Sequence, residues 1–225
     1  MNTAVALIGN GKVAQYLSQA IPRGLNQVEI FARNPRSEEH YLGALEPGDY
    51  DLLLLCVSDD ALAEVSRKIS ASDALVAHVS GASPLEIIAE HHSRKAIWYP
   101  LMSMRADLNL DIGEIPFCVE TSRKEDLAWL EKWTGQLGAT SYRVDSRQRP
   151  YLHLAAVLAH NFSNQLYHLA YGVLQEKGLS LDILRPLLQQ NLDTLKQGDP
   201  ARYQTGPAVR GDESTIRRHL EMLRD

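Results

Sequence analysis

The stretch "TAVALIGNGKVAQYL", residues 3–17, joins a short apolar run to a segment with helical spacing. Between the two lies a G-x-G-x-x-A pattern that ends at Ala14. The first glycine permits a tight turn, the second lets the backbone approach a pyrophosphate, and the alanine lets helix and strand pack closely. Unpaired amides at the start of the helix would bind that pyrophosphate. We therefore predict a dinucleotide site, against the alternative of a tight turn without ligand, at Gly9, Asn10, Gly11, Lys12 and Val13.

Short apolar runs alternate with helix-like segments between residues 3 and 145. Such alternation predicts an α/β fold, a parallel sheet with helices on both faces. The expected strands are TAVALIG (3–9), QVEIFA (27–32), DLLLLCV (51–57), ALVAHVS (74–80), KAIWYP (95–100), IPFCVE (115–120) and SYRVD (141–145). The expected helices are KVAQYLSQAI (12–21), DDALAEVSRKI (59–69), PLEIIAEH (84–91) and RKEDLAWLEKWTGQL (123–137).

The pattern changes to long helices near Pro150, a residue suited to a first helical turn. We place a domain boundary there, with a dinucleotide-binding domain over residues 1–148 and an all-helical domain over residues 149–225. A long helix is expected over 151–177, ended by Gly178. A second helix would follow a Ser180 cap and restart at Pro186, and a third would be capped by Asp212 or Ser214.

The end of the second strand indicates which dinucleotide is bound. An acidic residue there would bond the ribose 2′-hydroxyl of NAD, but this strand ends in Arg33-Asn34-Pro35-Arg36. A guanidinium can form a bidentate pair of hydrogen bonds with a 2′-phosphate, whereas a carboxylate repels it. We predict NADP (NADPH) as cofactor, held by Arg33 and Asn34 with help from Arg36. The alternative is a solvated basic turn.

The next two strands end in polar groups at the same expected edge of the sheet. Val57, Ser58 and Asp59 follow the third strand, and their backbone would lie along the cofactor, although both polar side chains would also suit a helix cap. Ser80-Gly81 lie at the end of the fourth strand, where Ser80 would bond a substrate or cap the next helix. Tyr99-Pro100 suits a rigid turn, with a cis peptide as one option.

The most unusual segment is "HLAAVLAHNFSNQLYHLAY", residues 153–171. At 100° per residue it places several polar groups on one stripe of an otherwise apolar helix, which would normally be buried. Buried imidazoles and amides need partners. The stripe consists of His153, His160, Asn164, His168 and Tyr171, with Asn161 at its margin. We predict that it faces a cleft between the domains, and the competing interpretation is a dimer interface. For His168 and Tyr171 we favour the interface or a place in the core. Histidines seven and eight residues apart do not suggest a metal site.

The bulk composition narrows the class of protein. A net charge of −5 favours neither nucleic acid nor anionic membranes as partners, and the arginines 143, 147 and 149 are expected to belong to a solvated linker. No apolar run is long enough to span a bilayer, and the N-terminus lacks the basic residues of a signal peptide. Cys56 and Cys118 are expected to be buried thiols, so a cytoplasmic location is expected.

These motifs resemble the 6-phosphogluconate dehydrogenase-like superfamily, which joins an N-terminal Rossmann domain to a C-terminal all-helical domain. The chain is similar in particular to a family of NADP oxidoreductases, sometimes called deazaflavin-dependent-like, that has no assigned reaction. The segments that carry the resemblance include LIGNGKVAQYL, DLLLLCVSDDAL, HVSGASPLEII, YPLMSM, IPFCVE, LHLAAVLAHNFSNQLY and TGPAVRGDESTIRRHL.

The resemblance implies that the long helix closes over the nicotinamide and that its polar residues meet the substrate. It implies that His153, Asn161 and Asn164 are catalytic and that Thr205, Arg210 and Asp212 bind the substrate. His160 is a further catalytic candidate because a histidine can act as acid or base near neutral pH. Ser80 and Gly81 are substrate-binding candidates because of their place at the strand end. From the residues alone, Arg210 has two interpretations: it binds an anionic substrate, or it is solvated in a connector. Hydroxyacid dehydrogenases of the superfamily carry a lysine four residues before an asparagine on this helix, where this chain has His160.

Two functions follow from these observations. The first is an NADP(H)-dependent oxidoreductase for a small anionic substrate, working as a homodimer joined through the helical domain, with a histidine handling the proton. The second is a dinucleotide-binding sensor or interaction protein without turnover, because the usual lysine is missing. The sequence identifies neither the substrate nor a role for a deazaflavin.

Overall fold

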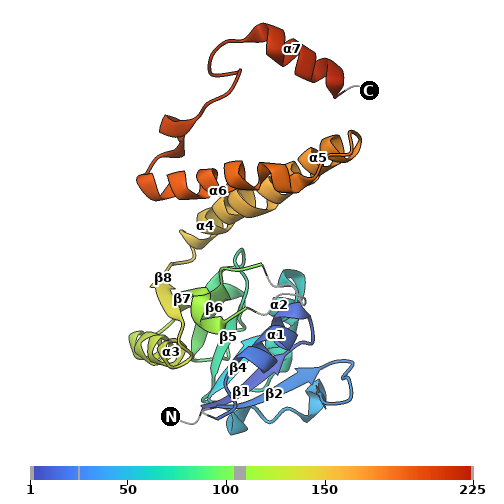
Figure 1. Ribbon diagram of the computed structural model, residues 1–225. Coiled ribbons are helices and arrows are strands. Elements are labelled where there is room, and N and C mark those ends of the chain that lie inside the picture. The colour runs from blue at the N-terminus through green and yellow to red at the C-terminus, as the bar shows by residue number, and fades with distance from the viewer. Residues whose placement is uncertain (1–2, 25, 104–109, 224–225) are drawn as a thin grey trace. The chain divides into compact units, whose positions relative to one another are not determined.

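The computed structural model describes residues 3–24, 26–103 and 110–223 (Figure 1). Its internal contacts divide the chain into two compact units, Met1–Asn161 and Phe162–Asp225. Helix α4 (Arg149–Ala156) begins one residue after the expected domain boundary, but its residues belong to the first compact unit. The boundary at residue 148 therefore stays a prediction.

The first unit contains an eight-stranded sheet in the order β3-β2-β1-β4-β5-β6-β7-β8. Six of the seven neighbouring pairs are parallel, and β7 runs antiparallel to β6. The strands are β1 (Thr3–Ile8), β2 (Asn26–Ala32), β3 (His40–Tyr41), β4 (Leu52–Leu55), β5 (Leu75–His78), β6 (Lys95–Pro100), β7 (Pro116–Thr121) and β8 (Thr140–Arg143).

The expected α/β fold is confirmed. The prediction of a wholly parallel sheet was wrong at β7, which runs antiparallel to β6. A parallel pair needs a long crossover, usually a helix, and the sequence has no helical pattern between β6 and β7. The antiparallel direction follows from that. The Tyr99–Pro100 peptide is trans, like the other peptide bonds in the described ranges, so the cis option was also wrong.

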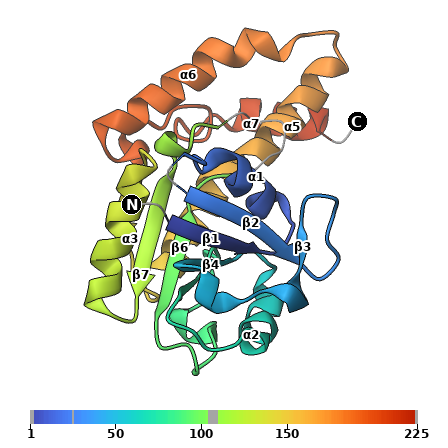
Figure 2. The ribbon, with the colours of Figure 1, turned by 90° about the horizontal axis from the view of Figure 1, so that it is seen from below.

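Helices cover both faces of the sheet (Figure 2). Helices α1 (Lys12–Ala20) and α3 (Lys124–Gln136) contribute to one buried cluster, and α2 (Asp59–Lys68) contributes to the other. The helix expected over residues 84–91 is wrong, since only a 3-10 turn over Leu85–Ile87 forms there. That single turn is enough to bury Leu85 and Ile88 against the second cluster.

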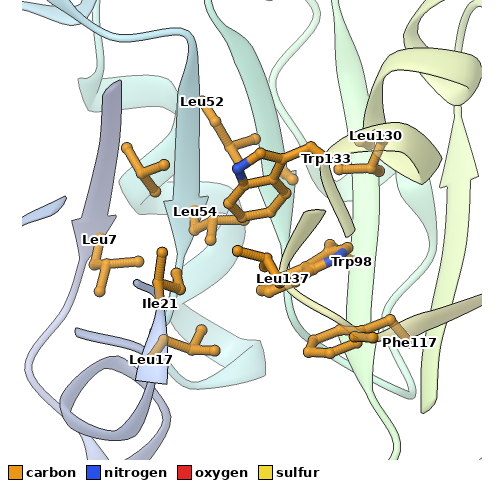
Figure 3. Close-up of a cluster of buried hydrophobic side chains, with 14 of the residues drawn as sticks. Leu7, Leu17, Ile21, Leu52, Leu54, Trp98, Phe117, Leu130, Trp133 and Leu137 are labelled. Carbon is orange, nitrogen blue, oxygen red and sulfur yellow. The ribbon is translucent and has the colours of Figure 1, made fainter. Parts of the chain in front are cut away.

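Aromatic packing holds the first cluster together (Figure 3). The rings of Trp98 and Phe117 stack with centroids 4.0 Å apart, and Trp133 packs beside them at 4.9 Å from Trp98. Each buried indole N–H has a partner: Trp98 donates to Thr134 Oγ1 at 2.9 Å, and Trp133 donates to Asn26 Oδ1 at 3.0 Å. Such pairing avoids the cost of a buried donor without an acceptor.

The long helix is interrupted in the middle. Helix α4 leads into a π-helical segment, Val157–Phe162, and then into α5 (Ser163–Gln175). Gly178 ends the helix as expected, with a left-handed φ of +66° and a bond from Leu179 N to Leu174 O. A stripe drawn at 100° per residue does not continue through the wider π turn, so the single continuous stripe predicted from the sequence is wrong.

The remaining helices belong to the second unit. They are η6 (Leu181–Leu184), α6 (Arg185–Thr194), η7 (Leu195–Gln197), η8 (Pro200–Tyr203) and α7 (Glu213–Met222). Ser180 caps η6 and Pro186 lies in the first turn of α6, as expected. Asp212, rather than Ser214, caps α7 by accepting the N–H of Thr215.

The long helix is not buried within one chain. Phe162 is 57% exposed and Leu166 is 64% exposed, although both belong to the apolar circumference that was expected to be covered. Over the part of the chain that the structure describes, no helix is both long and apolar enough to cross a membrane. Cys56 and Cys118 are buried free thiols, and burial raises the pKa of Cys56 to about 12.

A buried histidine at the end of β5 makes stability depend on pH. His78 Nδ1 accepts the N–H of Ser80 at 3.2 Å, and His78 Nε2 lies 3.3 Å from the carbonyl oxygen of Pro84. Burial lowers the pKa of His78 to about 4, with Arg149 adding to the effect and the Pro84 carbonyl opposing it. The folded chain therefore keeps this ring neutral down to acidic pH.

We expect the free energy of unfolding to fall by about 3 kcal/mol between pH 6.5 and pH 4 on account of His78. Above pH 6.5 the ring is neutral in both states, and below that the unfolded chain binds its proton first. Urea denaturation at several pH values measures the slope. His78→Gln should flatten it, whereas His168→Gln, on the exposed surface of α5, should not. Equal slopes in both variants would contradict the assignment.

Candidate functional site

A pocket of about 360 Å³ lies at the carboxyl ends of β1, β2 and β4, and we call it the glycine-turn pocket. Carboxyl ends of neighbouring parallel strands are where α/β sheets bind ligands. Most of the predicted cofactor residues line it, namely Gly9, Asn10, Gly11, Arg33, Asn34, Val57 and Ser58. Lys12, Val13 and Asp59 lie in the adjoining first turns of α1 and α2, outside the lining.

The backbone conformation and the close packing at position 9 both require a glycine. Its φ is +114°, and a Cβ placed there would lie 2.5 Å from the carbonyl oxygen of Cys56. Its N–H donates to Phe31 O at 2.8 Å, so the turn is tied to β2 as well as pressed against β4. A Cβ on Gly11, by contrast, would meet no atom nearer than the Cys56 carbonyl oxygen at 4.0 Å. Gly9 therefore closes the turn, and Gly11 leaves open space for a ligand.

The loop after β2 is held by Glu39, which the sequence analysis did not identify. Its carboxylate accepts the N–H of Arg36 at 2.9 Å and the side-chain amides of Asn10 at 3.1 Å and Gln15 at 2.8 Å. Burial opposes ionisation of this carboxyl, but the three hydrogen bonds and the charge of Arg36 hold its pKa below the ordinary value. The Glu39 carboxylate therefore joins the glycine turn, through Asn10, to the basic loop after β2, through Arg36.

The cationic wall of the pocket comes from β2 and α2. Arg33 and Asn34 are exposed at the end of β2, and Lys68 of α2 lines the same pocket while pairing with Glu64 at 2.5 Å. Ser58 occupies the cap position of α2, but its side chain makes no capping bond, so the expected capping role is wrong. Its exposed hydroxyl remains available to a ligand in the pocket.

A second pocket of about 350 Å³, which we call the β6 pocket, lies beyond the end of β6. Leu101, Met102 and Ser103 follow the strand on one side, and α4 with the π segment forms the other. All of its lining residues lie in the first compact unit. Three of the predicted catalytic residues are among them: His153, His160 and Asn161.

A hydrogen bond in the wall of the β6 pocket joins Tyr99 to His153. The tyrosine hydroxyl lies 3.0 Å from His153 Nδ1, and the two rings meet edge to face with centroids 6.0 Å apart. Gly81, a predicted substrate residue, packs against both: a Cβ on it would lie 2.6 Å from Tyr99 Cζ and 2.8 Å from His153 Nδ1. Gly81 therefore permits the pair to form.

Ser80 points away from solvent, into its own turn. Its hydroxyl oxygen accepts the N–H groups of Ala82 at 3.1 Å and Ser83 at 3.0 Å, and the side chain is buried. The helix-cap alternative for Ser80 is wrong, because the 3-10 turn that follows has Pro84 at its cap position and the Ser80 hydroxyl stabilises a turn of its own. A substrate-binding role for it stays a prediction.

Arg149 contradicts the expectation of a solvated linker. Its guanidinium is buried, donates to Glu120 Oε2 at 2.7 Å and to the carbonyl oxygen of Ser83 at 2.6 Å, and lies 3.3 Å from Ser146 Oγ. Arg143 pairs with Glu131 and Arg147 pairs with Asp145 on the surface, so only part of the expectation holds. Arg149 fixes the start of α4 to the sheet.

The remaining predicted site residues lie in the second unit. Asn164, His168 and Tyr171 are exposed on α5, and Thr205 and Arg210 are exposed in the segment before α7. The Asp212 carboxylate bonds Thr215 and Ser214 in the cap of α7. The functional roles of these residues stay predictions.

Comparison with known proteins places these features in a family. A family model described as a domain of unknown function, DUF2520, matches residues 115–225. The crystal structure of a "putative NADP oxidoreductase" from Bacteroides fragilis matches with 31% sequence identity and a TM-score of 0.85, covering 99% of this chain and 91% of that one. The chain belongs to the same family.

More distant members of the fold are also recognisable. A protein from Thermotoga maritima matches this chain with 20% identity and a TM-score of 0.69, over 96% of this chain and 87% of that one. Pyrroline carboxylate reductase from Plasmodium falciparum, solved with NADP bound, matches with 11% identity and a TM-score of 0.66, over 98% of this chain and 92% of that one. No curated protein sequence matches. The family recognised in the sequence is confirmed, and the two distant structures support the Rossmann fold.

We expect Gly9→Ala to lower the free energy of unfolding by about 2 kcal/mol or more, because it adds strain at a positive φ and a contact with the Cys56 carbonyl. Gly11→Ala is the matched control, with an expected change of less than about 1 kcal/mol. Urea denaturation monitored by tryptophan fluorescence measures both. A Gly9 variant as stable as the Gly11 variant would contradict the account of the turn.

We expect Arg149→Met to lower the free energy of unfolding by about 3 kcal/mol, because it leaves the partly buried Glu120 carboxylate without its cation. Arg147→Met, which breaks an exposed pair two residues earlier, should change stability by less than about 0.5 kcal/mol. The same denaturation assay compares the two. Similar small losses in both variants would show that Arg149 does not anchor the helix.

Proposed function

We propose that this protein is an NADP(H)-dependent oxidoreductase that acts on a small, anionic substrate. The observation that carries the proposal is the glycine-turn pocket, where Gly9 closes the turn and Gly11 leaves room beside free helix amides. The name of the Bacteroides fragilis relative and the NADP bound to the Plasmodium falciparum reductase support it. A bound nicotinamide would supply or accept the hydride.

The pocket fits a dinucleotide by its donor groups as well as its space. Gly11 begins α1 with no side-chain cap, and no acidic residue lies in the first turn of that helix. The amides there would bind the pyrophosphate. Asn10 is held by Glu39 and by the Asn34 carbonyl oxygen at 3.1 Å, so it positions the turn around the phosphates.

Arg33 supports the preference for NADP over NAD. It projects from the end of β2 into the lining of the pocket, where a 2′-phosphate on the adenosine ribose would lie. The nearest anionic lining residue, Glu64, is paired with Lys68, which reduces its repulsion of a phosphate. Glu39 is likewise engaged, by Arg36 N, Asn10 and Gln15.

The β6 pocket would hold the substrate. Tyr99, His153, His160 and Asn161 offer hydrogen-bonding groups beside an apolar wall, an arrangement that suits a small organic molecule with a polar head. Asn164, Thr205, Arg210 and Asp212 are proposed as further catalytic and substrate-binding residues. Their contribution rests on the family resemblance, and an anionic substrate would pair with Arg210.

We expect Arg33→Ala to weaken NADPH binding by about 10- to 100-fold, because one charged hydrogen-bonding partner of the 2′-phosphate is lost. NADH binding should change by less than about threefold. Calorimetric titration of both cofactors measures the difference, with Arg23→Ala, before the opposite end of β2, as the control. Equal affinities for NADPH and NADH in the unmodified protein would refute the assignment.

We expect Gly11→Ala to reduce affinity for both cofactors by at least about tenfold while the fold is kept, because its methyl group enters the space for the pyrophosphate. A variant that binds normally would show that the pocket is not the pyrophosphate site. Binding without turnover of any carbonyl or imine substrate would instead favour the sensor.

The homodimer through the helical domain is part of the proposal. Apolar side chains on the described helices of the second unit are exposed in the single chain, among them Leu166, Leu169, Ile183, Leu187 and Leu192. Exposed apolar surface on this scale is typical of an interaction site. Light scattering of the whole protein tests it, and a monomer at high concentration would count against it.

A further inference from the structure

We propose that Tyr99 is the proton donor of the reaction, and that His153 returns the proton to it through their hydrogen bond. The inference deepens the proposed function, because it assigns the proton step of a reductase to one hydroxyl group. It also requires a substrate whose reduction takes up a proton together with the hydride, and the class that we propose is a molecule with a C=O bond or a neutral C=N bond.

The position of Tyr99 in the sheet supports this role. β5 and β6 are parallel, with His78 opposite Ile97, so Tyr99 lies beside Ser80-Gly81 at the carboxyl edge of the sheet. The glycine-turn pocket occupies the same edge at β1, β2 and β4, and β5 separates it from β6. A dinucleotide bound at the glycine turn extends along this edge. Its reactive end would therefore approach Gly81 and the tyrosine next to it.

The pair lies in the wall of the β6 pocket. Tyr99 and His153 both line this pocket, and the hydroxyl oxygen lies 3.0 Å from Nδ1. The backbone of Gly81 packs against both side chains, so close that a Cβ there would lie within 3 Å of each. Arg149, four residues before His153, holds the first turn of α4 to β7 through Glu120. The position of the pair is thus set by β6, by the close approach of Gly81 and by one buried ion pair.

The chemistry balances with a reduced nicotinamide as the source of the hydride. As the substrate carbon accepts the hydride, the π electron pair moves onto the oxygen or nitrogen. That atom takes the proton of the Tyr99 hydroxyl, whose O–H bond breaks. The phenolate then takes the proton of His153 Nδ1 while His153 Nε2 takes a proton from solvent, so the ring stays neutral and the reaction consumes one hydride and one proton overall. In the oxidation direction each transfer is reversed.

The environment keeps Tyr99 in its protonated form. Burial, together with the neighbouring Cys118, raises the pKa of the hydroxyl, and Arg149 opposes the shift. A hydroxyl that remains protonated through the neutral range can serve as a donor in every cycle. His153 is then a positioning and proton-returning residue, because it acts through Tyr99.

The first test is spectroscopic and requires no substrate. Nitrogen NMR of the imidazole rings in the whole protein should show that Tyr99→Phe displaces the His153 resonances, which are identified by their loss in His153→Gln. The resonances of His91, which bonds the Ile69 carbonyl oxygen at 2.9 Å, should not move. Gly81→Ala should displace the His153 resonances as well. Unchanged His153 resonances in Tyr99→Phe would overturn the proposal.

The second test measures reduction of two probes, 1-pyrroline and pyruvate, by NADPH. For whichever probe the unmodified protein reduces, Tyr99→Phe should lower kcat by about 100-fold or more, with NADPH affinity within about twofold of normal. Tyr151→Phe, on the exposed side of α4, should keep the full rate. Added imidazole should partly restore the rate of His153→Ala. A Tyr99→Phe variant with normal kcat would overturn the proposal.

The outcomes separate the two proposals. If NADPH does not bind, the proposed function fails, and the coupling of Tyr99 to His153 is still judged by NMR. If NADPH binds and neither probe is reduced, the NMR result alone decides the relay. Binding together with a fully active Tyr99→Phe variant leaves the oxidoreductase in place and removes Tyr99 as its proton donor.

Discussion

The close approach of the glycine turn between β1 and α1 to the end of β4 is the constraint on which the rest of the structure depends. The carbonyl oxygen of Cys56 lies where a Cβ of residue 9 would be, so the chain can pass from β1 to α1 only through glycine. That turn places the start of α1 and the ends of β2 and β4 around one pocket. Hydrogen bonds from Gly9 N to Phe31 and from Asn10 to the loop of Glu39 then fix the basic end of β2 beside it. The apolar packing of Trp98, Phe117 and Trp133 supports the far end of the same sheet.

The parts of the fold that the sequence predicts correctly are those with local causes. The glycine turn follows from one motif between a strand and a helix, and the ends of the later helices follow from Gly178, Ser180 and Asp212. The direction of β7 was missed because the residue types along a strand do not record its direction, and the signal lay in the connection before it, which lacks the helix that a parallel crossover needs. The π segment was missed because the apolar spacing across Val157–Phe162 is equally compatible with a regular helix.

In the candidate site, too, residues with local signals were identified and residues with distant partners were missed. Arg33, Asn34 and the glycines were identified because each lies at a strand end with a known chemical preference. Glu39 was missed because its role depends on partners 24 and 29 positions away, Gln15 and Asn10. Arg149 was misjudged because its partner Glu120 lies 29 residues earlier, on another strand. Tyr99 was noticed only as part of a turn, although its position at a strand end beside Gly81 was a signal that could have marked it.

The buried arginine at the start of α4 has a consequence for where the proposed proton donor is assembled. Because Arg149 is bound to Glu120 and Ser83, the first turn of this helix is anchored to β7 and to the turn after β5. His153 follows one helical turn later and meets Tyr99 of β6, so both members of the pair belong to the same compact unit as the glycine turn. The distance between the tyrosine hydroxyl and the imidazole is therefore set within one unit of the chain, by the strand and the anchored helix that carry them.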